Sequence, residues 1–119
     1  MNSEGSKNPL RDKSYLFAVQ VVKLCQTLVL DKKEFVLSKQ LIRSGTAIGA
    51  LIRESEFAAS KRDFINKLTV SLKEANEKEY WLTLLLDTKY IDYSLFKNLH
   101  SLCKELIAML VTSIKTAKR

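Results

Sequence analysis

The chain has 119 residues, with 20 Lys and Arg against 13 Asp and Glu and a formal net charge of +7 at pH 7. A chain of this length forms one domain with a single core. Cys25 and Cys103 lie in apolar helical patterns without metal-ligand spacing, so we expect both to be reduced core residues. No apolar signal segment opens the chain, and no run approaches the ~20 apolar residues of a membrane helix, so we expect a cytoplasmic protein with no membrane role.

The first part of the chain predicts a polar tail followed by two helices. Residues 1–11 carry no periodic apolar pattern, and Pro9 disfavours a helix that begins before about Leu10. A flexible tail is therefore expected there. Apolar residues then recur every three or four positions, which predicts helices over residues 13–30 and 34–59.

Two further helices are predicted in the second half, each with a start signal. Ser60 is a candidate N-cap for a helix over residues 61–86, and Asp63 places a carboxylate in its first turn. Asp92 is a candidate N-cap for a helix over residues 93–117. Because short turns join the four helices, consecutive helices must run antiparallel. The fold class is therefore all-α, an antiparallel up-and-down four-helix bundle over residues 12–119.

Two glycines interrupt the second predicted helix. Each glycine costs about 1 kcal/mol relative to alanine inside a helix, so we expect close helix packing at Gly45 and Gly49 to offset the cost. A phosphate-binding loop is a poor alternative, because no strand precedes these glycines and no Gly-Lys-Ser/Thr follows them.

The second and third predicted helices carry apolar or small residues on the side away from their core stripes. The large Trp81 outside the core is either an anchor of a homo-oligomer interface or a half-buried residue at a helix seam. We favour the interface, and the residues expected in it are Arg43, Ala47, Ala50, Val70, Trp81 and Leu84.

Glu79 falls near the helical line of Leu68, so we expect a buried carboxylate that needs a partner. Candidate partners are Arg43, Arg53 or a nearby serine hydroxyl. The alternatives are a structural polar pair, which we favour, and an acid/base or metal carboxylate. A single histidine, His100, excludes a di-iron bundle and gives no zinc site, so no cofactor, metal site or catalytic residue is expected.

The positive charge favours a polyanionic partner, although it also serves solubility. Candidate nucleic-acid contacts are Arg53, Lys61, Arg62, Lys67, Lys73 and Lys78, helped by Lys115, Lys118 and Arg119 at the end of the chain. The sequence has no base-reading motif. Binding of RNA or DNA is therefore expected to be sequence-neutral and strongly salt-dependent.

Three segments carry a resemblance to a known bacterial family. They are KNPLRDKSYLFAVQVVKL, EFVLSKQLIRSGTAIGALIRES and SKRDFINKLTVSLKEANEKEYWLTLL. The chain resembles the four helix bundle protein family, also called the 23S rRNA intervening-sequence protein family, over about residues 7–117. The family pattern reads closer to Ala-Asn-Ile where this chain has Ala50-Leu51-Ile52, which makes the second helix more apolar here.

The resemblance implies a four-helix bundle that assembles into a ring, a pentamer. A related accessory protein of diversity-generating retroelements uses a similar basic pentameric barrel to bind nucleic acid and a reverse transcriptase. The family has no established enzymatic activity or catalytic residue. The favoured hypothesis is a non-enzymatic oligomer that binds structured RNA or DNA, and the alternative is a structural or protein–protein interaction module. An enzyme, the third hypothesis, needs a polar cavity around Glu79, and no small-molecule substrate is identified.

Overall fold

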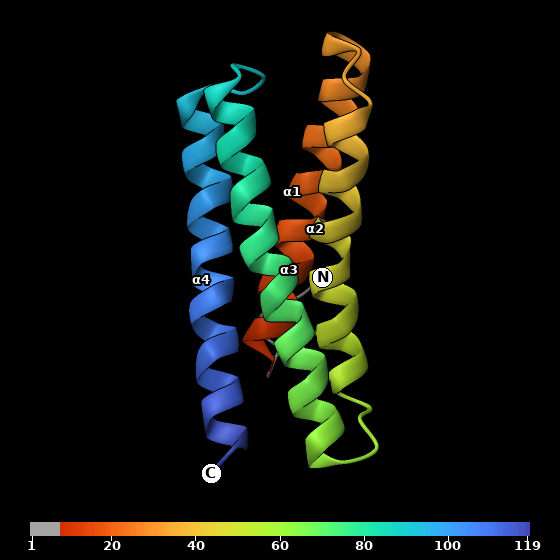
Figure 1. Ribbon diagram of the computed structural model, residues 1–119, viewed down its shortest axis with the longest axis vertical. Helices are drawn as coiled ribbons and strands as arrows, with labels where there is room; N and C mark the ends of the chain where they lie inside the picture. The colour runs from red at the N-terminus through yellow and green to blue at the C-terminus, as the bar shows by residue number, and fades with distance from the viewer. Residues whose placement is uncertain (1–7) are drawn as a thin grey trace.

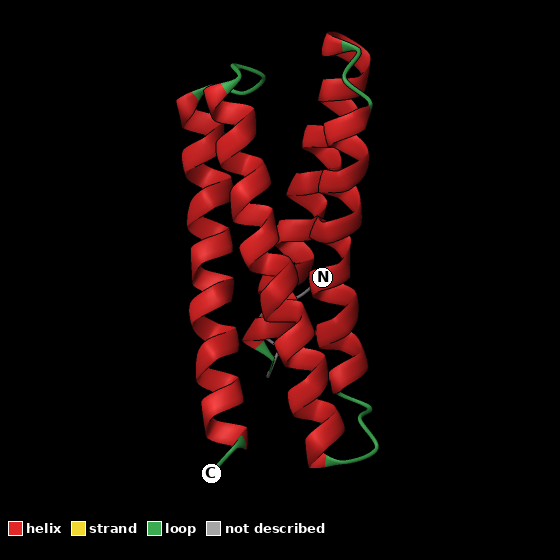
Figure 2. Cartoon of the chain, viewed as in Figure 1, coloured by secondary structure: helices red, strands yellow, loops and turns green. Residues whose placement is uncertain are grey.

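The computed structural model describes residues 8–119, which form four long helices and no strand (Figures 1 and 2). The helices are α1 (Pro9–Lys32), α2 (Val36–Ser55), α3 (Lys61–Asp87) and α4 (Tyr93–Ala117). Each helix packs antiparallel to the next one in the chain, and α4 returns to contact α1. The predicted all-α, up-and-down four-helix bundle is thereby confirmed.

The first helix begins earlier than the sequence suggested. The Asn8 side chain accepts a hydrogen bond of 3.0 Å from the Arg11 N–H, and Pro9 occupies the first turn, where a missing N–H costs no helical hydrogen bond. The predicted tail is therefore wrong for residues 8–11, which are capped and helical from Pro9 onward. Residues 1–7 of that prediction lie outside the described residues.

The turn between α1 and α2 is shaped by a left-handed residue and a capping carboxylate. Lys33 adopts a φ of 55°, which ends α1. The Glu34 carboxylate then accepts hydrogen bonds of 3.0 Å and 2.9 Å from the N–H groups of Leu37 and Ser38, so α2 begins at Val36. This carboxylate satisfies N–H groups that the first turn of a helix leaves without partners.

The second helix ends at Ser55, four residues before its predicted end. The chain must reverse between α2 and α3, and Ser60 is already extended, with φ −158° and ψ 167°. The predicted Ser60 cap is confirmed, because Ser60 Oγ accepts a hydrogen bond of 3.0 Å from the Asp63 N–H. Asp92 is likewise confirmed, since its carboxylate accepts a hydrogen bond of 2.8 Å from the Leu95 N–H at the start of α4.

The core lies where the four helices meet, and α3 shows its pattern most clearly. Buried residues on α3 recur at alternating intervals of three and four, as in a coiled-coil heptad. They are Leu68, Ser71, Ala75, Lys78, Leu82 and Leu85. Cys25 and Cys103 are both buried and unbridged, as predicted. A lysine at one of these core positions is unusual, because its charge must leave water.

Gly45 brings α1, α2 and α3 close together. A Cβ atom built at Gly45 would lie 2.6 Å from Lys78 Nζ and 2.8 Å from Val21 Cγ1. The close packing predicted at this glycine is therefore confirmed. A Cβ atom at Gly49 would meet Ser14 Oγ at 3.6 Å, which is ordinary van der Waals contact, so packing does not require the second glycine.

By length and composition alone, α1 is long and apolar enough to cross a membrane, which the sequence reading did not anticipate. Of the most apolar 18-residue stretch of α1, only 33% is buried in the bundle. Core helices of soluble proteins pass the same test, so this finding is weak evidence for a membrane. The hydropathy of α1 is high because the helix is apolar on two sides. Phe17 and Val21 face the core, whereas Tyr15, Leu16 and Leu30 are exposed.

Candidate nucleic-acid interface

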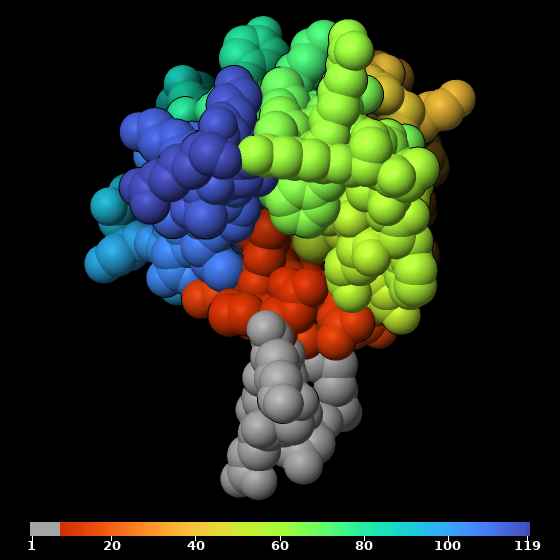
Figure 3. Space-filling view, turned by 90° about the horizontal axis from the view of Figure 1, so that it is seen from below, coloured from red at the N-terminus to blue at the C-terminus, as the bar shows by residue number. Residues whose placement is uncertain are grey.

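The start of α3 and the end of α4 meet at one end of the bundle. There the Lys61 ammonium donates a hydrogen bond of 2.9 Å to the main-chain oxygen of Arg119. Figure 3, which views this end directly, shows the last residues of α4 against the first residues of α3. Five exposed basic residues gather here, and we call them the basic end: Lys61, Arg62, Lys115, Lys118 and Arg119.

The basic end is largely free of neutralising carboxylates. Lys61 is engaged with the Arg119 main-chain oxygen, and none of the five side chains forms an ion pair with an Asp or Glu within residues 8–119. Asp63 lies nearby, but its carboxylate accepts a hydrogen bond from the Ala59 N–H and lies 4.0 Å from Lys67 Nζ. The positive end of the α3 helix dipole is offset here by the negative end of the α4 dipole, so the positive charge of this end comes from the five side chains. The end therefore presents a positive field that suits phosphate groups.

The other predicted nucleic-acid contacts are of two kinds, exposed residues without an ion pair and residues already paired with a carboxylate. Arg53 and Lys73 are exposed and form no ion pair among the described residues. Lys67 is half-buried, and its ammonium lies 3.6 Å from the Glu54 carboxylate. A phosphate would have to displace that carboxylate, so Lys67 is a weaker candidate for a phosphate contact than the residues of the basic end.

Lys78 was wrongly predicted as a surface contact. Its side chain is 0% exposed, and its ammonium group donates a hydrogen bond to the Leu41 carbonyl on α2. Burial lowers the pKa of Lys78 to about 7, from the 10.5 of a free lysine. A side chain enclosed in this way cannot reach a phosphate on the surface.

The prediction of a buried carboxylate holds in part for Glu79, because its Oε2 atom is buried although the side chain as a whole is partly exposed. Its side chain is 31% exposed, and its Oε2 atom lies 3.0 Å from Lys104 Nζ and 3.3 Å from His100 Nε2. Both partners come from α4, whereas the sequence analysis proposed arginines and serines. His100 also stacks on Phe96, with ring centroids 4.8 Å apart. Glu79 therefore belongs to a half-exposed polar cluster at the α3–α4 seam.

The residues of the predicted oligomer interface lie on α2 and α3. Trp81 is half-buried against the core, and its Nε1–H donates a hydrogen bond of 3.3 Å to Glu77, whose carboxylate lies 3.6 Å from the Arg43 guanidinium. Val70 and Ala50 are exposed, whereas Ala47 and Leu84 are partly buried. The structure thus brings Arg43 and Trp81 to one seam, and the interface itself stays a prediction.

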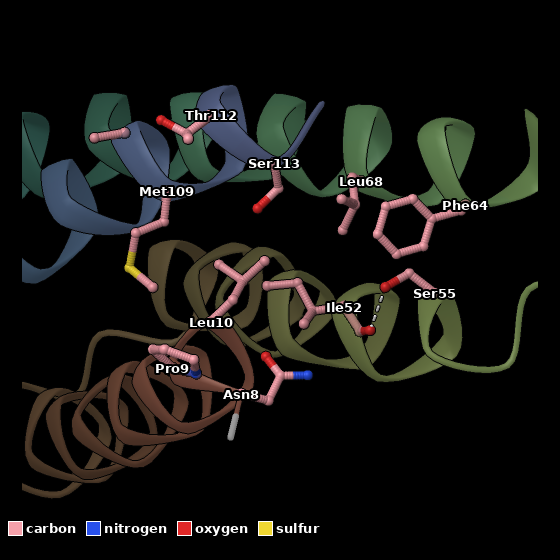
Figure 4. A pocket seen from close by; sticks show the side chains of 11 residues that line it. Asn8, Pro9, Leu10, Ile52, Ser55, Phe64, Leu68, Met109, Thr112 and Ser113 are labelled. Carbon is pink, nitrogen blue, oxygen red and sulfur yellow. Dashed lines mark hydrogen bonds between the residues drawn. The ribbon is translucent and has the colours of Figure 1, made fainter. Parts of the chain in front are cut away.

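A cavity of about 450 Å³ lies between the first turn of α1 and the other three helices (Figure 4). Its lining residues are Asn8, Pro9, Leu10, Ile52, Ser55, Phe64, Leu68, Ala108, Met109, Thr112 and Ser113. None of these side chains titrates, so they supply no general acid or base. Across residues 8–119, no three His, Cys, Asp or Glu side chains gather in a way that could hold a metal ion.

The fold and the charge distribution define a basic, up-and-down four-helix bundle. The chain belongs to the 23S rRNA-intervening sequence protein family, whose model matches residues 7–112.

A solved structure supports the same fold. It is the crystal structure of a protein with unknown function from the S23 ribosomal protein family, from Bacteroides thetaiotaomicron VPI-5482. It is 52% identical to this chain, with a TM-score of 0.88, and the match covers 89% of this chain and 98% of the other. No curated protein matches the chain in a sequence search.

Proposed function

We propose that this protein is a non-enzymatic homo-oligomer that binds structured RNA or DNA through its basic end. The observation that carries the proposal is the gathering of five exposed basic side chains, none paired with an Asp or Glu among the described residues, where α3 begins and α4 ends. Repetition of this end in an oligomer would place several such clusters on one particle. Several weak phosphate contacts made together bind far more tightly than one alone.

The chemistry of the basic end favours backbone contacts over base reading. Lysine and arginine side chains neutralise phosphates, and the affinity then depends on the counterions that they release. None of the four helices carries a known base-reading motif, so the shape and charge of the nucleic acid should decide binding. The family's name connects it with an insertion in 23S rRNA, which makes a structured RNA the first ligand to test.

The test compares two double variants that remove the same charge. Arg62→Gln with Lys118→Gln alters the basic end, whereas Lys23→Gln with Lys97→Gln removes exposed charges elsewhere. Fluorescence anisotropy with a labelled RNA stem-loop at low salt measures the affinity of each. We expect the basic-end variant to bind about tenfold more weakly than the control variant, which corresponds to about 1.4 kcal/mol. Equal affinities of the two variants would contradict the assigned interface.

Assembly is supported by apolar surface that the single bundle leaves uncovered. A helix that is apolar all round is normally buried, yet Leu30 on α1 is 70% exposed. Phe35 and Val36, at the start of α2, are also exposed. This second surface adds to the one predicted around Val70 and Trp81. Covering both in a homo-oligomer would remove apolar area from water.

Light scattering tests the assembly and tells the two surfaces apart. The wild type should have a mass several times the 13.6 kDa of one chain. Leu30→Asp probes the α1–α2 surface, and Val70→Asp probes the α2–α3 surface. Trp81 is a poorer probe, because it also packs against the core. A wild type with the mass of one chain would rule out the oligomer.

The second candidate function is a protein–protein interaction module without a nucleic-acid role. It is favoured by an apolar groove of about 460 Å³ on the outer side of α1 and α2, which includes Val29, Leu30 and Phe35. In this case the oligomer would persist, and the labelled RNA would show no binding even at low salt.

A further inference from the structure

Lys78 lies fully buried at the seam between the α1–α2 hairpin and the α3–α4 hairpin. It projects from α3, and its ammonium group donates a hydrogen bond to the Leu41 carbonyl on α2. The ring of Phe17 on α1 lies with its centroid 6.0 Å from Nζ, at the outer limit of a cation–π contact. One side chain therefore connects both hairpins from inside the core.

The space for this amine depends on the absence of a side chain at Gly45. A Cβ atom there would lie 2.6 Å from Lys78 Nζ and 3.1 Å from its Cε atom. The glycine thus forms one wall of a cradle that closely fits the end of the lysine. Such a fit leaves little room for a water molecule beside the amine on this side.

No charged partner compensates the ammonium inside the cradle. The titratable groups that influence it are Cys25 on α1, Cys103 on α4, and Glu74 and Glu77 on α3 itself. The buried residues of α2 include no titratable side chain. No carboxylate forms an ion pair with Lys78 within the described part of the chain.

The two thiols do not supply the missing negative charge. Burial raises the pKa of Cys25, and burial raises the pKa of Cys103 to about 12, so both stay neutral near pH 7. They donate their protons to main-chain carbonyls, Cys25 to Ser38 at 3.5 Å and Cys103 to Ala75 at 3.3 Å. The thiols around the ammonium are therefore neutral, and Glu74 and Glu77, on its own helix, act on it without forming an ion pair.

The site suits a neutral amine better than an ammonium. An ammonium has three N–H donors, and the structure gives Lys78 a single carbonyl acceptor. A buried charge without a partner is costly, and opening the seam to water removes that cost. The axes of the two hairpins already diverge toward the end that holds the α1–α2 and α3–α4 turns (Figure 1). Separation of the hairpins would expose Lys78 without unwinding any helix.

We propose that Lys78 is a proton-sensitive lock between the two hairpins, which closes around the neutral amine and opens when the amine is protonated. The sign of the effect follows from proton linkage. Between about pH 7 and pH 10, the opened chain holds the lysine proton and the closed bundle releases it. Raising the pH across this range therefore stabilises the closed bundle, and lowering the pH toward 7 favours opening.

The test measures hydrogen exchange of the full chain at several pH values, after correction for intrinsic exchange rates. Lys78→Met keeps an unbranched side chain and removes the titrating group. Lys73→Met, on the exposed side of the same helix, is the matched control. In the wild type and the control, the opening constant of the seam amides near Leu41 and Lys78 should fall by about 20-fold from about pH 6.5 to about pH 8.5. Lys78→Met should lack this fall.

Two results would overturn the proposal. One is a Lys78→Met profile that matches the wild-type profile, and the other is a pH-dependent step confined to global unfolding. A direct measurement covers the case in which Lys78→Met does not fold. In wild-type protein labelled with ¹³C-lysine, the Lys78 Cε resonance should titrate close to neutral pH, and titration above about pH 10, as for a free lysine, would refute the lock.

Discussion

Replacement of Gly45 by alanine probes a place where α1, α2 and α3 leave no room for a side chain. The new methyl carbon would lie 2.6 Å from Lys78 Nζ and 2.8 Å from Val21 Cγ1, both well inside normal contact distance. Valine in a helix is held in one rotamer, so Val21 cannot turn away. The lysine must move instead, and it then loses its hydrogen bond to Leu41.

Three contributions set the size of the effect. Overpacking a core costs about 1–3 kcal/mol, and a buried polar group left without its partner costs about 1–3 kcal/mol. Alanine recovers about 1 kcal/mol of helix propensity relative to glycine. We therefore expect Gly45→Ala to lower the free energy of unfolding by about 3 kcal/mol, which lowers Tm by about 12 °C for a chain of this size.

Gly49→Ala is the matched control, because the same change is made one turn along the same helix. Its methyl carbon would meet Ser14 atoms at 3.6–3.8 Å, so the gain in helix propensity should stabilise the chain by up to about 1 kcal/mol. Urea unfolding followed by far-UV circular dichroism measures both variants. A loss of unfolding free energy for Gly45→Ala together with a gain for Gly49→Ala would support close packing at Gly45. A Gly45→Ala variant as stable as Gly49→Ala would refute it.

Three further outcomes follow from the caps, the thiols and the α3–α4 cluster. Asp92→Ala removes the N-cap of α4 and should cost about 1 kcal/mol in urea unfolding, so an unchanged midpoint would argue against the cap. Cys25 and Cys103 should react with iodoacetamide much more slowly in the folded protein than in urea, as followed by mass spectrometry; equal rates would contradict their burial. Glu79→Gln should change the free energy of unfolding by less than about 1 kcal/mol, because its ion pairs are partly exposed, and a larger loss would show a stronger cluster.

The sequence predicts the fold well because its start signals are local. Ser60 and Asp92 cap the two helices that they were expected to cap, since a capping side chain and its N–H partner lie only three residues apart. The end of α2 was harder to locate. The apolar residues Phe57 and Ala58 extend the helical pattern, yet Phe57 is exposed in the turn that reverses the chain.

Lys78, predicted at the surface, is fully buried, whereas Glu79, predicted in the core stripe, is partly exposed, and the difference has a geometric cause. A straight helix with 3.6 residues per turn places Glu79 almost in line with Leu68, eleven residues before it. The buried positions of α3 follow a 3.5-residue repeat instead, and the two repeats drift apart by about 20° per heptad. Counting intervals of three and four from Leu68 reaches Lys78, so a heptad pattern would have found the buried lysine.

The basic end depends on tertiary structure more than on any single segment. Its residues come from two helices, and Lys61 lies 58 positions before Arg119 in the chain. Their meeting follows from the up-and-down topology, which brings the start of α3 and the end of α4 to the same end of the bundle. What the sequence cannot supply is the ion pairing, which engages Lys67 with Glu54 and Asp63 and gives Arg62 no Asp or Glu partner among the described residues.

The salt dependence of RNA binding tests the central claim most directly. The slope of log Kobs against log salt concentration counts the phosphate contacts, at about 0.7–0.9 per contact. We predict that Arg62→Gln with Lys118→Gln lowers the magnitude of this slope by about 1.5, whereas Lys23→Gln with Lys97→Gln leaves it unchanged. Identical slopes for both double variants and the wild type would show that the basic end does not contact the RNA.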